Sequence, residues 1–207
     1  MFLKEITVSN YGFFALAFRQ KYIKRWGLMY NISEETLSEH ACEVAMVSHA
    51  LAMIGNRYYQ KSYNSDRIAA LGLYHDVPEV YTGDLPTPVK YFSASSKESY
   101  RQIEKRAIEM LLSKLPPELS EDYRELFYYE DNNPEAKKLI KAADKICAYI
   151  KCLDEERCGN YEFTSAKKTL LAALDELHCP EAEYFMENFL SYFNMTLDEL
   201  QNDGEDE

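Results

Sequence analysis

Glycine and proline are scarce in this chain, with seven residues of each among 207. A β-rich fold of this size needs many tight turns, and turns draw heavily on these two residue types. No segment shows sustained polar–apolar alternation either, so the sequence argues against a β-sandwich or a barrel. Because 46% of the residues are hydrophobic and 14% are aromatic, we expect one all-α globular domain with a sizeable core.

Basic residues are too few to balance the acidic ones, and the formal net charge is −12. The last ten residues, DELQNDGEDE, hold six acids and no base. We therefore expect a domain over residues 1–197 and an acidic, disordered tail over residues 198–207. An acidic surface does not suit a nucleic-acid polymer, although a pocket can still bind one small phosphate.

Long apolar runs are absent, and none approaches the roughly 20 residues that span a bilayer. The segment MFLKEITVSNYGFFALAFRQ faintly resembles a signal peptide, but Glu5 falls where basic residues are needed and Gly12 interrupts the apolar run. Phe14, Phe18 and Tyr22 recur at helical spacing and favour an amphipathic first helix instead. We expect a cytoplasmic protein that binds no membrane.

Cysteines are few and form no C-x-x-C pair. Their number is odd, which does not suit a disulfide framework. We expect buried, reduced thiols. The five are Cys42, Cys147, Cys152, Cys158 and Cys179.

Helix start and stop signals divide nearly the whole chain. Thr36 and Glu39 have the spacing of a capping box, and Pro134 suits the first turn of a long helix. Gly159-Asn160 is a typical helix end. The predicted helices cover residues 13–24, 36–54, 65–76, 96–114, 117–128, 134–158, 163–178 and 180–193, with a turn-rich loop after residue 76.

Three ionisable residues fall on helix stripes that should face the core. These are His40, His75 and Asp144, and Asp76 follows His75 directly. A buried carboxylate is costly unless it is paired or binds a metal. Two imidazoles and two carboxylates suit one divalent transition metal with positions left for water and substrate.

Each of these residues alone has an ordinary explanation. A single histidine in a core is usually satisfied by a neighbouring polar group, and Asp144 lies among lysines that could pair with it on a solvated face. The joint spacing therefore carries the metal hypothesis. His49 points away from His40, and His178 lies at a helix end, so we expect one metal rather than two.

The order His40, His75-Asp76, Asp144 resembles the H…HD…D signature of the HD-domain metal-dependent phosphohydrolases. The segments KRWGLM, SEHACEVAMVSHALA, YHDVPEVYTGDLPTPVKYF and KAADKICAYIKCLDE resemble bacterial 5′-deoxynucleotidases of this superfamily, over roughly residues 13–193. The resemblance implies a single helical HD domain and one divalent transition metal such as cobalt, manganese or zinc. It also implies a homodimer and hydrolysis of 2′-deoxyribonucleoside 5′-monophosphates to deoxynucleoside and phosphate.

The resemblance implies roles for individual residues as well. His40, His75, Asp76 and Asp144 would hold the metal, and Asp76 would also belong to the catalytic set. Glu79 would be the catalytic base beside the metal-bound water. The ordinary alternative for Glu79 is a loop-capping residue.

The substrate contacts would come from other segments. Arg25 and Trp26 match the family's phosphate- and sugar-contacting pair, Arg25 with a catalytic role in orienting the phosphate, and Asp84 matches the residue that contacts the 3′-hydroxyl. His40 would also face the substrate, and Glu130 is the candidate in the segment 127–134, whose role the resemblance leaves open. The ordinary alternatives are a basic helix end for Arg25, a core residue for Trp26 and a turn residue for Asp84.

Other functions remain open on the sequence alone. The chain could be a phosphohydrolase for a ribonucleotide or a cyclic dinucleotide. A nucleotide-sensing helical module without catalysis should have lost Glu79 or Arg25, and both are present. An aromatic stripe of Phe185, Phe189 and Tyr192 could instead serve an all-α oligomerisation protein.

Overall fold

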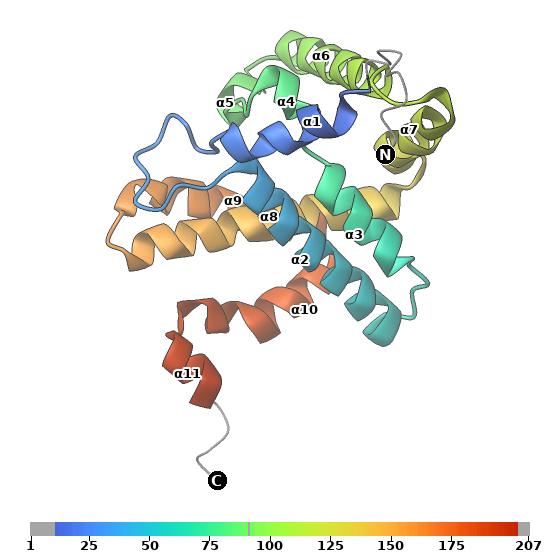
Figure 1. Cartoon of the computed structure of the whole chain (residues 1–207). Coiled ribbons are helices and arrows are strands. Elements are labelled where there is room, and N and C mark those ends of the chain that lie inside the picture. The colour runs from blue at the N-terminus through green and yellow to red at the C-terminus, as the bar shows by residue number, and fades with distance from the viewer. Residues whose placement is uncertain (1–10, 91, 203–207) are drawn as a thin grey trace, which may run out of the picture.

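The computed structural model describes residues 11–90 and 92–202 (Figure 1). Within these ranges the regular structure is helical, apart from one isolated antiparallel bridge between Lys24 and Thr36, so the predicted all-α class is confirmed. The longer helices are α2 (Leu37–Tyr58), α6 (Ala94–Leu112), α7 (Pro117–Asn132), α8 (Pro134–Arg157) and α9 (Thr164–Leu177). The shorter elements are α1 (Phe13–Ala17), η1 (Phe18–Tyr22), α3 (Ser65–Tyr74), α4 (Glu79–Thr82), α5 (Thr87–Lys90), η2 (Tyr161–Phe163), α10 (Pro180–Phe189), η3 (Leu190–Asn194) and α11 (Leu197–Asn202).

Helices α2 and α8 cross at the centre of the molecule (Figure 1). Helix α3 packs along α2, while α9 and α10 contact α8. One core cluster forms between these helices, and a second lies beneath α1 and α6. Tyr74, the last residue of α3, packs against both clusters. The His75-Asp76 pair therefore follows a helix end that is fixed between two cores.

A glycine lets α2 and α3 approach closely. A Cβ atom added to Gly72 would lie 2.6 Å from Ser48 Oγ and 2.9 Å from Ala45 Cα on α2. Because backbone atoms block that space, only glycine fits without moving one helix. The close approach brings the start of α2, with His40, near the end of α3, with His75.

The capping box predicted at the start of α2 is confirmed. The Thr36 hydroxyl accepts from the Glu39 N–H, and the Glu39 carboxylate accepts from the Thr36 N–H at 2.7 Å. The backbone N–H of Arg25 donates to the Glu35 carbonyl at 2.9 Å, beside the cap. This pairing holds residues 23–25 against the N-terminus of α2 and so places Arg25 beside the first turn of that helix.

A buried carboxylate near the end of α8 anchors the loop before α2. Glu155 is 1% exposed and accepts from the backbone N–H groups of Ile32 at 2.9 Å and Ser33 at 3.1 Å. Asn160 donates to it at 2.7 Å, and the Lys151 ammonium also donates to it. Burial alone would raise the pKa of Glu155, but these donors lower it to about 2.

The first helix differs from the sequence prediction in its extent and in its buried face. It ends as a 3₁₀ turn at Tyr22, and the side chains predicted to form its apolar face are exposed, with Phe18 at 70%. Phe13 and Ala17 are buried instead. Phe14 is already exposed in the α-helical part, so the predicted stripe was on the wrong face, and the tighter 3₁₀ winding changes the direction of the residues that follow. Residues 1–10, which held the signal-peptide alternative, lie outside the described residues.

The loop after Asp76 and the C-terminal segment are more helical than predicted. The loop contains the short helices α4 and α5. Residues 198–202 of the predicted tail belong to α11, whose start has a Thr196–Glu199 hydrogen-bond pair like that of α2. Residues 203–207 lie outside the described residues. Disorder was predicted from the acidic composition alone, but the Thr196–Glu199 cap satisfies helix N–H groups and stabilises α11 whatever the net charge.

Two smaller predictions hold only in part. Cys147, Cys152 and Cys179 are buried free thiols, but Cys42 and Cys158 are exposed. In the aromatic stripe, Phe185 is buried, while Phe189 and Tyr192 are 44% and 42% exposed. Among the described residues, no helix is both long enough and apolar enough to cross a membrane.

We expect Glu155→Gln to destabilise the fold at neutral pH by roughly 3 kcal/mol. This follows from a pKa that falls from an ordinary 4.5 to about 2 on folding, at about 1.36 kcal/mol per unit. The group is charged when folded, so its contribution is complete above about pH 5 and is lost as the pH falls towards 2. Urea unfolding at about pH 7, 4 and 3 should show a shrinking difference between variant and wild type.

The exposed Glu162→Gln is the matched control, and its effect should stay within about 0.5 kcal/mol at every pH. A Glu155→Gln effect that does not change with pH would contradict the role of the charge.

Candidate metal centre and active-site cavity

Three parts of the chain meet around one imidazole. His40, in the first turns of α2, is fully buried, and its Nε2 lies 3.1 Å from Asp144 Oδ1 on α8. Asp76 Oδ2, just after α3, lies 4.0 Å from the same nitrogen and 3.0 Å from His75 Nε2. The structure therefore brings together all four residues that the resemblance assigned to the metal.

The four residues are not equally close to one another. One potential ligand atom from each of His40, His75 and Asp76 lies within 4.8 Å of the other two. Asp144 contacts His40 but lies outside this compact group of three. Its side chain is 39% exposed, because it stands at a cavity and not within the core that its helix stripe predicted. An acid at the open side of the cluster is accessible to an incoming ion.

The hydrogen bonds of His75 suit a metal ligand. Its Nδ1 lies 2.7 Å from the Gly72 carbonyl oxygen, which can only accept, so Nδ1 carries the proton. In the neutral ring, Nε2 then has the free lone pair, and this atom lies 3.0 Å from Asp76 Oδ2, so both could point at one cation. A backbone acceptor that fixes the tautomer is the usual support for a metal-ligating histidine. The donor set thus fits a divalent transition metal.

The charges within the cluster favour protons on the histidines. Burial alone would lower the pKa of His75, but the Asp76 carboxylate outweighs it and raises that pKa to about 9. Burial likewise opposes ionisation of Asp76, and the neighbouring His75, His40 and Arg25 lower its pKa. A cation that binds here displaces a proton from His75, so its affinity falls in acid.

Glu35 supports the site from behind, and the sequence reasoning missed it. Its carboxylate is 9% exposed, with Oε1 3.3 Å from His40 Nδ1. Oε2 accepts from Arg25 Nε at 3.2 Å and from Trp26 Nε1 at 2.8 Å. Burial would raise the pKa of Glu35, but these partners lower it. Glu35 directly precedes the N-cap Thr36, and an acidic residue at such a position does not by itself indicate a functional site.

Arg25 and Trp26 are held in fixed orientations. Arg25 Nη1 lies 3.6 Å from Asp76 Oδ2, so the guanidinium borders the ligand cluster. Burial disfavours its charge, but Glu35, Asp144, Asp76 and Asp84 together raise its pKa. Trp26 has a φ of +58°, a strained conformation for a bulky residue, and its ring packs edge-on against Phe163 at 5.2 Å.

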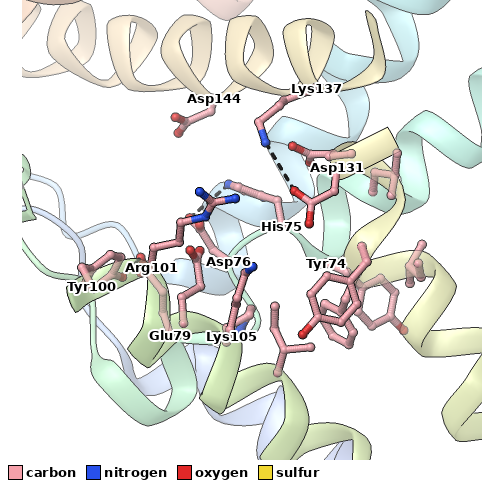
Figure 2. Close-up of a pocket in the computed structure, with 18 of the residues that line it drawn as sticks. Tyr74, His75, Asp76, Glu79, Tyr100, Arg101, Lys105, Asp131, Lys137 and Asp144 are labelled. Atoms are coloured by element: carbon pink, nitrogen blue, oxygen red, sulfur yellow. Dashed lines mark hydrogen bonds and ion pairs between the residues drawn. The ribbon is translucent and has the colours of Figure 1, made fainter. Parts of the chain in front are cut away.

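A cavity of about 540 Å³ opens beside the cluster. Figure 2 shows His75, Asp76 and Glu79 on one side, Asp144 above them on α8, and Arg101 and Lys105 from α6 reaching into the same space. Lys97, Arg101 and Lys105 recur at i, i+4 and i+8 and form a basic helix face, which the set of residues predicted from the sequence did not include. The lining residues are Leu71, Tyr74, His75, Asp76, Pro78, Glu79, Lys90, Lys97, Tyr100, Arg101, Glu104, Lys105, Ile108, Leu126, Phe127, Tyr128, Glu130, Asp131, Lys137 and Asp144.

Glu79 begins the short helix α4 and points its carboxylate towards this cavity (Figure 2). Burial raises its pKa to about 7, the Asp76 charge adds to the rise, and Lys90 opposes it. Lys90 Nζ donates to Glu79 Oε1 at 2.7 Å. A carboxyl group with a pKa near neutrality can exchange protons at working pH.

The other predicted substrate residues are divided between two sides of the cluster. Glu130 lines the cavity near the end of α7, and burial raises its pKa. Arg25, Trp26 and Asp84 do not line this cavity, and the fully buried His40 does not either. The segment 127–134 is the end of α7 and the start of α8, where Glu130, Asp131 and Lys137 form one wall.

Solved structures of similar shape share the fold. An HD-domain phosphohydrolase from Listeria innocua matches with a TM-score of 0.77 and 21% identity, and the match covers 87% of each chain. The cyanophage S-2L HD phosphohydrolase, bound to dA and one catalytic Zn²⁺ ion, matches with a TM-score of 0.62 and 19% identity over 86% of this chain and 95% of that one. The helical HD-domain architecture is therefore confirmed.

Curated relatives are much closer in sequence. A 5′-deoxynucleotidase of Photobacterium profundum is 47% identical over 188 residues, which are 91% of this chain and 97% of that protein. The 5′-deoxynucleotidase YfbR of Shigella flexneri is 48% identical over 93% of this chain and 96% of its own length. The model of the 5′-deoxynucleotidase YfbR-like family matches residues 12–193. The chain belongs to the YfbR-like family of 5′-deoxynucleotidases.

Proposed function

We propose that this chain is a metal-dependent 5′-deoxynucleotidase that hydrolyses 2′-deoxyribonucleoside 5′-monophosphates to deoxynucleoside and phosphate. The observation that carries the proposal is the meeting of the His40, His75 and Asp76 cluster with the buried carboxylate of Glu79 at one cavity. A volume of about 540 Å³ is in the range of small-molecule sites. The named activity of the close relatives supports the same reaction.

His40, His75, Asp76 and Asp144 would hold one divalent cation. When bound, it supplies a Lewis acid that polarises a phosphate oxygen and lowers the pKa of water from about 15.7 towards 7. Zinc is the ion named for the cyanophage enzyme, and cobalt and manganese suit the same donors. Asp76 Oδ2 lies 3.0 Å from His75 Nε2 and 4.0 Å from His40 Nε2, so its carboxylate reaches both histidines and ties the cluster together.

Glu79 acts as the general base. Its Oε2 is buried and has no hydrogen-bond partner among the described residues, so it is free to accept a proton from the attacking water. The water oxygen then bonds to phosphorus and the bond from phosphorus to the 5′-oxygen breaks. The 5′-oxygen takes up the proton that Glu79 accepted, so the nucleoside leaves as its 5′-alcohol and Glu79 is again a carboxylate. A raised pKa suits this role, because the group must both take up and release the proton near neutral pH.

Arg25 orients the phosphate. Glu35 holds its Nε, and its Nη1 already lies beside Asp76, so the guanidinium is preorganised next to the reacting group. Trp26 is fixed by the same carboxylate and would wall the sugar, where its shape leaves no room for a 2′-hydroxyl. Asp84 would accept from the 3′-hydroxyl, and Glu130 would face the substrate from α7.

A nucleotide-sensing module without catalysis is the second candidate. It would bind a deoxynucleotide at the same cluster and never release phosphate. The presence of both Glu79 and Arg25 beside the ligand set disfavours it. A homodimer, a cytoplasmic location and a single domain over residues 1–197 stay predictions of the sequence.

The first prediction of the proposed function concerns the choice of sugar. Metal-stripped protein resupplied with zinc, cobalt or manganese should release phosphate from dAMP, and at least about tenfold more slowly from AMP, because the 2′-hydroxyl meets the Trp26 side chain. Colorimetric phosphate release with paired substrates measures this. Release from neither substrate, with dAMP still bound, would favour the sensing module.

Removal of one ligand tests the metal centre. We expect Asp76→Ala to lose bound metal and to lower kcat/KM by more than about 100-fold, since even outer-sphere partners of a metal cost 10–100-fold. Metal content by mass spectrometry and helicity by circular dichroism check this. The exposed Asp175→Ala on α9 is the matched control and should keep both. Full metal content in Asp76→Ala would contradict the ligand assignment.

Replacement of the base should separate catalysis from metal binding. Glu79→Gln keeps the shape of the side chain but cannot take up the proton, so kcat should fall by about 10²–10⁴ with metal content unchanged. Steady-state kinetics with dAMP measure the loss, and the exposed Glu176→Gln on α9 should match wild type. A wild-type kcat in Glu79→Gln would remove Glu79 from the mechanism.

A further inference from the structure

The two carboxylate oxygens of Glu79 have different surroundings. Oε1 accepts from Lys90 Nζ at 2.7 Å and from the Tyr100 hydroxyl at 3.4 Å. Oε2 is buried and has no hydrogen-bond partner among the described residues. A carboxylate held by one oxygen can present the other in a single direction. Because Oε1 is held and Oε2 is not, the carboxylate can accept a proton from a water molecule in one defined orientation.

Three separate helices build this contact. Glu79 begins α4, Lys90 ends α5 and Tyr100 lies in α6. The Lys90 ammonium also lies 5.1 Å from the centre of the Tyr100 ring, at a distance typical of a cation–π contact. The ammonium of Lys90 and the hydroxyl of Tyr100 therefore both donate to the same carboxylate oxygen, Glu79 Oε1.

The ion pair is shielded from water. The side chain of Lys90 is 19% exposed and that of Glu79 is 7% exposed. A surface pair contributes little and exchanges partners freely, but a pair at this depth keeps its geometry because each charge lacks a good alternative. The pair also faces the cavity that holds Asp76, so its position bears directly on the reacting atoms.

We propose that Lys90 and Tyr100 are positioning residues for the catalytic base: they hold Glu79 by Oε1 so that Oε2 faces the attacking water. The proposal rests on the proposed function, in which Glu79 accepts the proton of that water. It gives the proline-containing segment between Asp84 and α6 a second task. Besides placing Asp84 beside the sugar, this segment contains α5, whose last residue, Lys90, has the ammonium group that orients Glu79.

Kinetics can distinguish a positioning role of Lys90 from two simpler roles, a purely structural ion pair and direct binding of the substrate phosphate. We expect Lys90→Met to lower kcat for dAMP by about 10- to 100-fold, with KM within about threefold and metal content unchanged, because the lysine acts only through the base. Lys90→Arg keeps a charged donor and should recover most of kcat. Tyr100→Phe removes the longer hydrogen bond and should cost about two- to fivefold.

The matched control is Lys168→Met, the same chemical change at an exposed position on α9, which should leave kcat and KM at wild-type values. A Lys90→Met enzyme with unchanged kcat would overturn the proposal and leave Lys90 a structural pair. An unchanged kcat with a raised KM would overturn it in favour of a phosphate-binding lysine.

A stability cycle tests the contact without any turnover. Urea midpoints are measured for wild type, Lys90→Met, Glu79→Gln and the double variant. Lys90→Met should lower the midpoint when Glu79 is present, since a buried carboxylate then lacks its partner, and should lower it less in the Glu79→Gln background. Equal shifts in both backgrounds would overturn the pairing. If wild type fails to hydrolyse dAMP while this coupling is present, the proposed function fails and the contact itself stands.

Discussion

One buried imidazole holds the architecture of the site together. The ring of His40 is fully enclosed, with Glu35 on one nitrogen and Asp144 and Asp76 near the other. Those carboxylates belong to the segment before α2, to α8 and to the residues after α3. An imidazole at this depth must have polar partners, because an unsatisfied buried nitrogen is costly. These contacts link α2 to the distant helix α8 and to the residues after α3, and they involve Glu35 in the segment directly before α2.

The charges of the cavity form two opposing sets. Asp76, Asp144 and Glu79 gather at the metal-binding end, and Lys90, Arg101 and Lys105 stand on the α5–α6 side. Acids packed this closely repel one another unless protons, a cation or basic partners compensate. The histidines lower the pKa values of Asp76 and Asp144, while burial and the Asp76 charge raise the pKa of Glu79. A nucleotide phosphate would enter between a cation held by one set and the basic side chains of the other.

Local sequence signals were reliable where the physics is local. The Thr36–Glu39 cap, the start of α8 at Pro134 and the all-α class all depend on interactions a few residues apart, and the structure confirms them. The prediction for the first helix failed because two apolar faces compete there: Phe13 and Ala17 are buried, while Phe14 and Phe18, at the same spacing, are exposed. The helix also ends early in a 3₁₀ turn, which periodicity does not reveal. The short helices α4 and α5 were missed because prolines and a glycine read as a turn.

The sequence by itself determined the longer helices, the family and the identity of the acid and imidazole groups, since these follow from residue type, spacing and motif order. Only the tertiary structure decided which groups meet. Glu35 behind His40, and Lys90 with Tyr100 on Glu79 Oε1, join residues whose spacing along the chain carries no periodic signal. The Glu79 contact depends on the packing of α4 and α5 against α6, and the close α2–α3 approach at Gly72 brings His75 near His40. Such contacts arise from the packing of whole helices, and one-dimensional spacing cannot encode them.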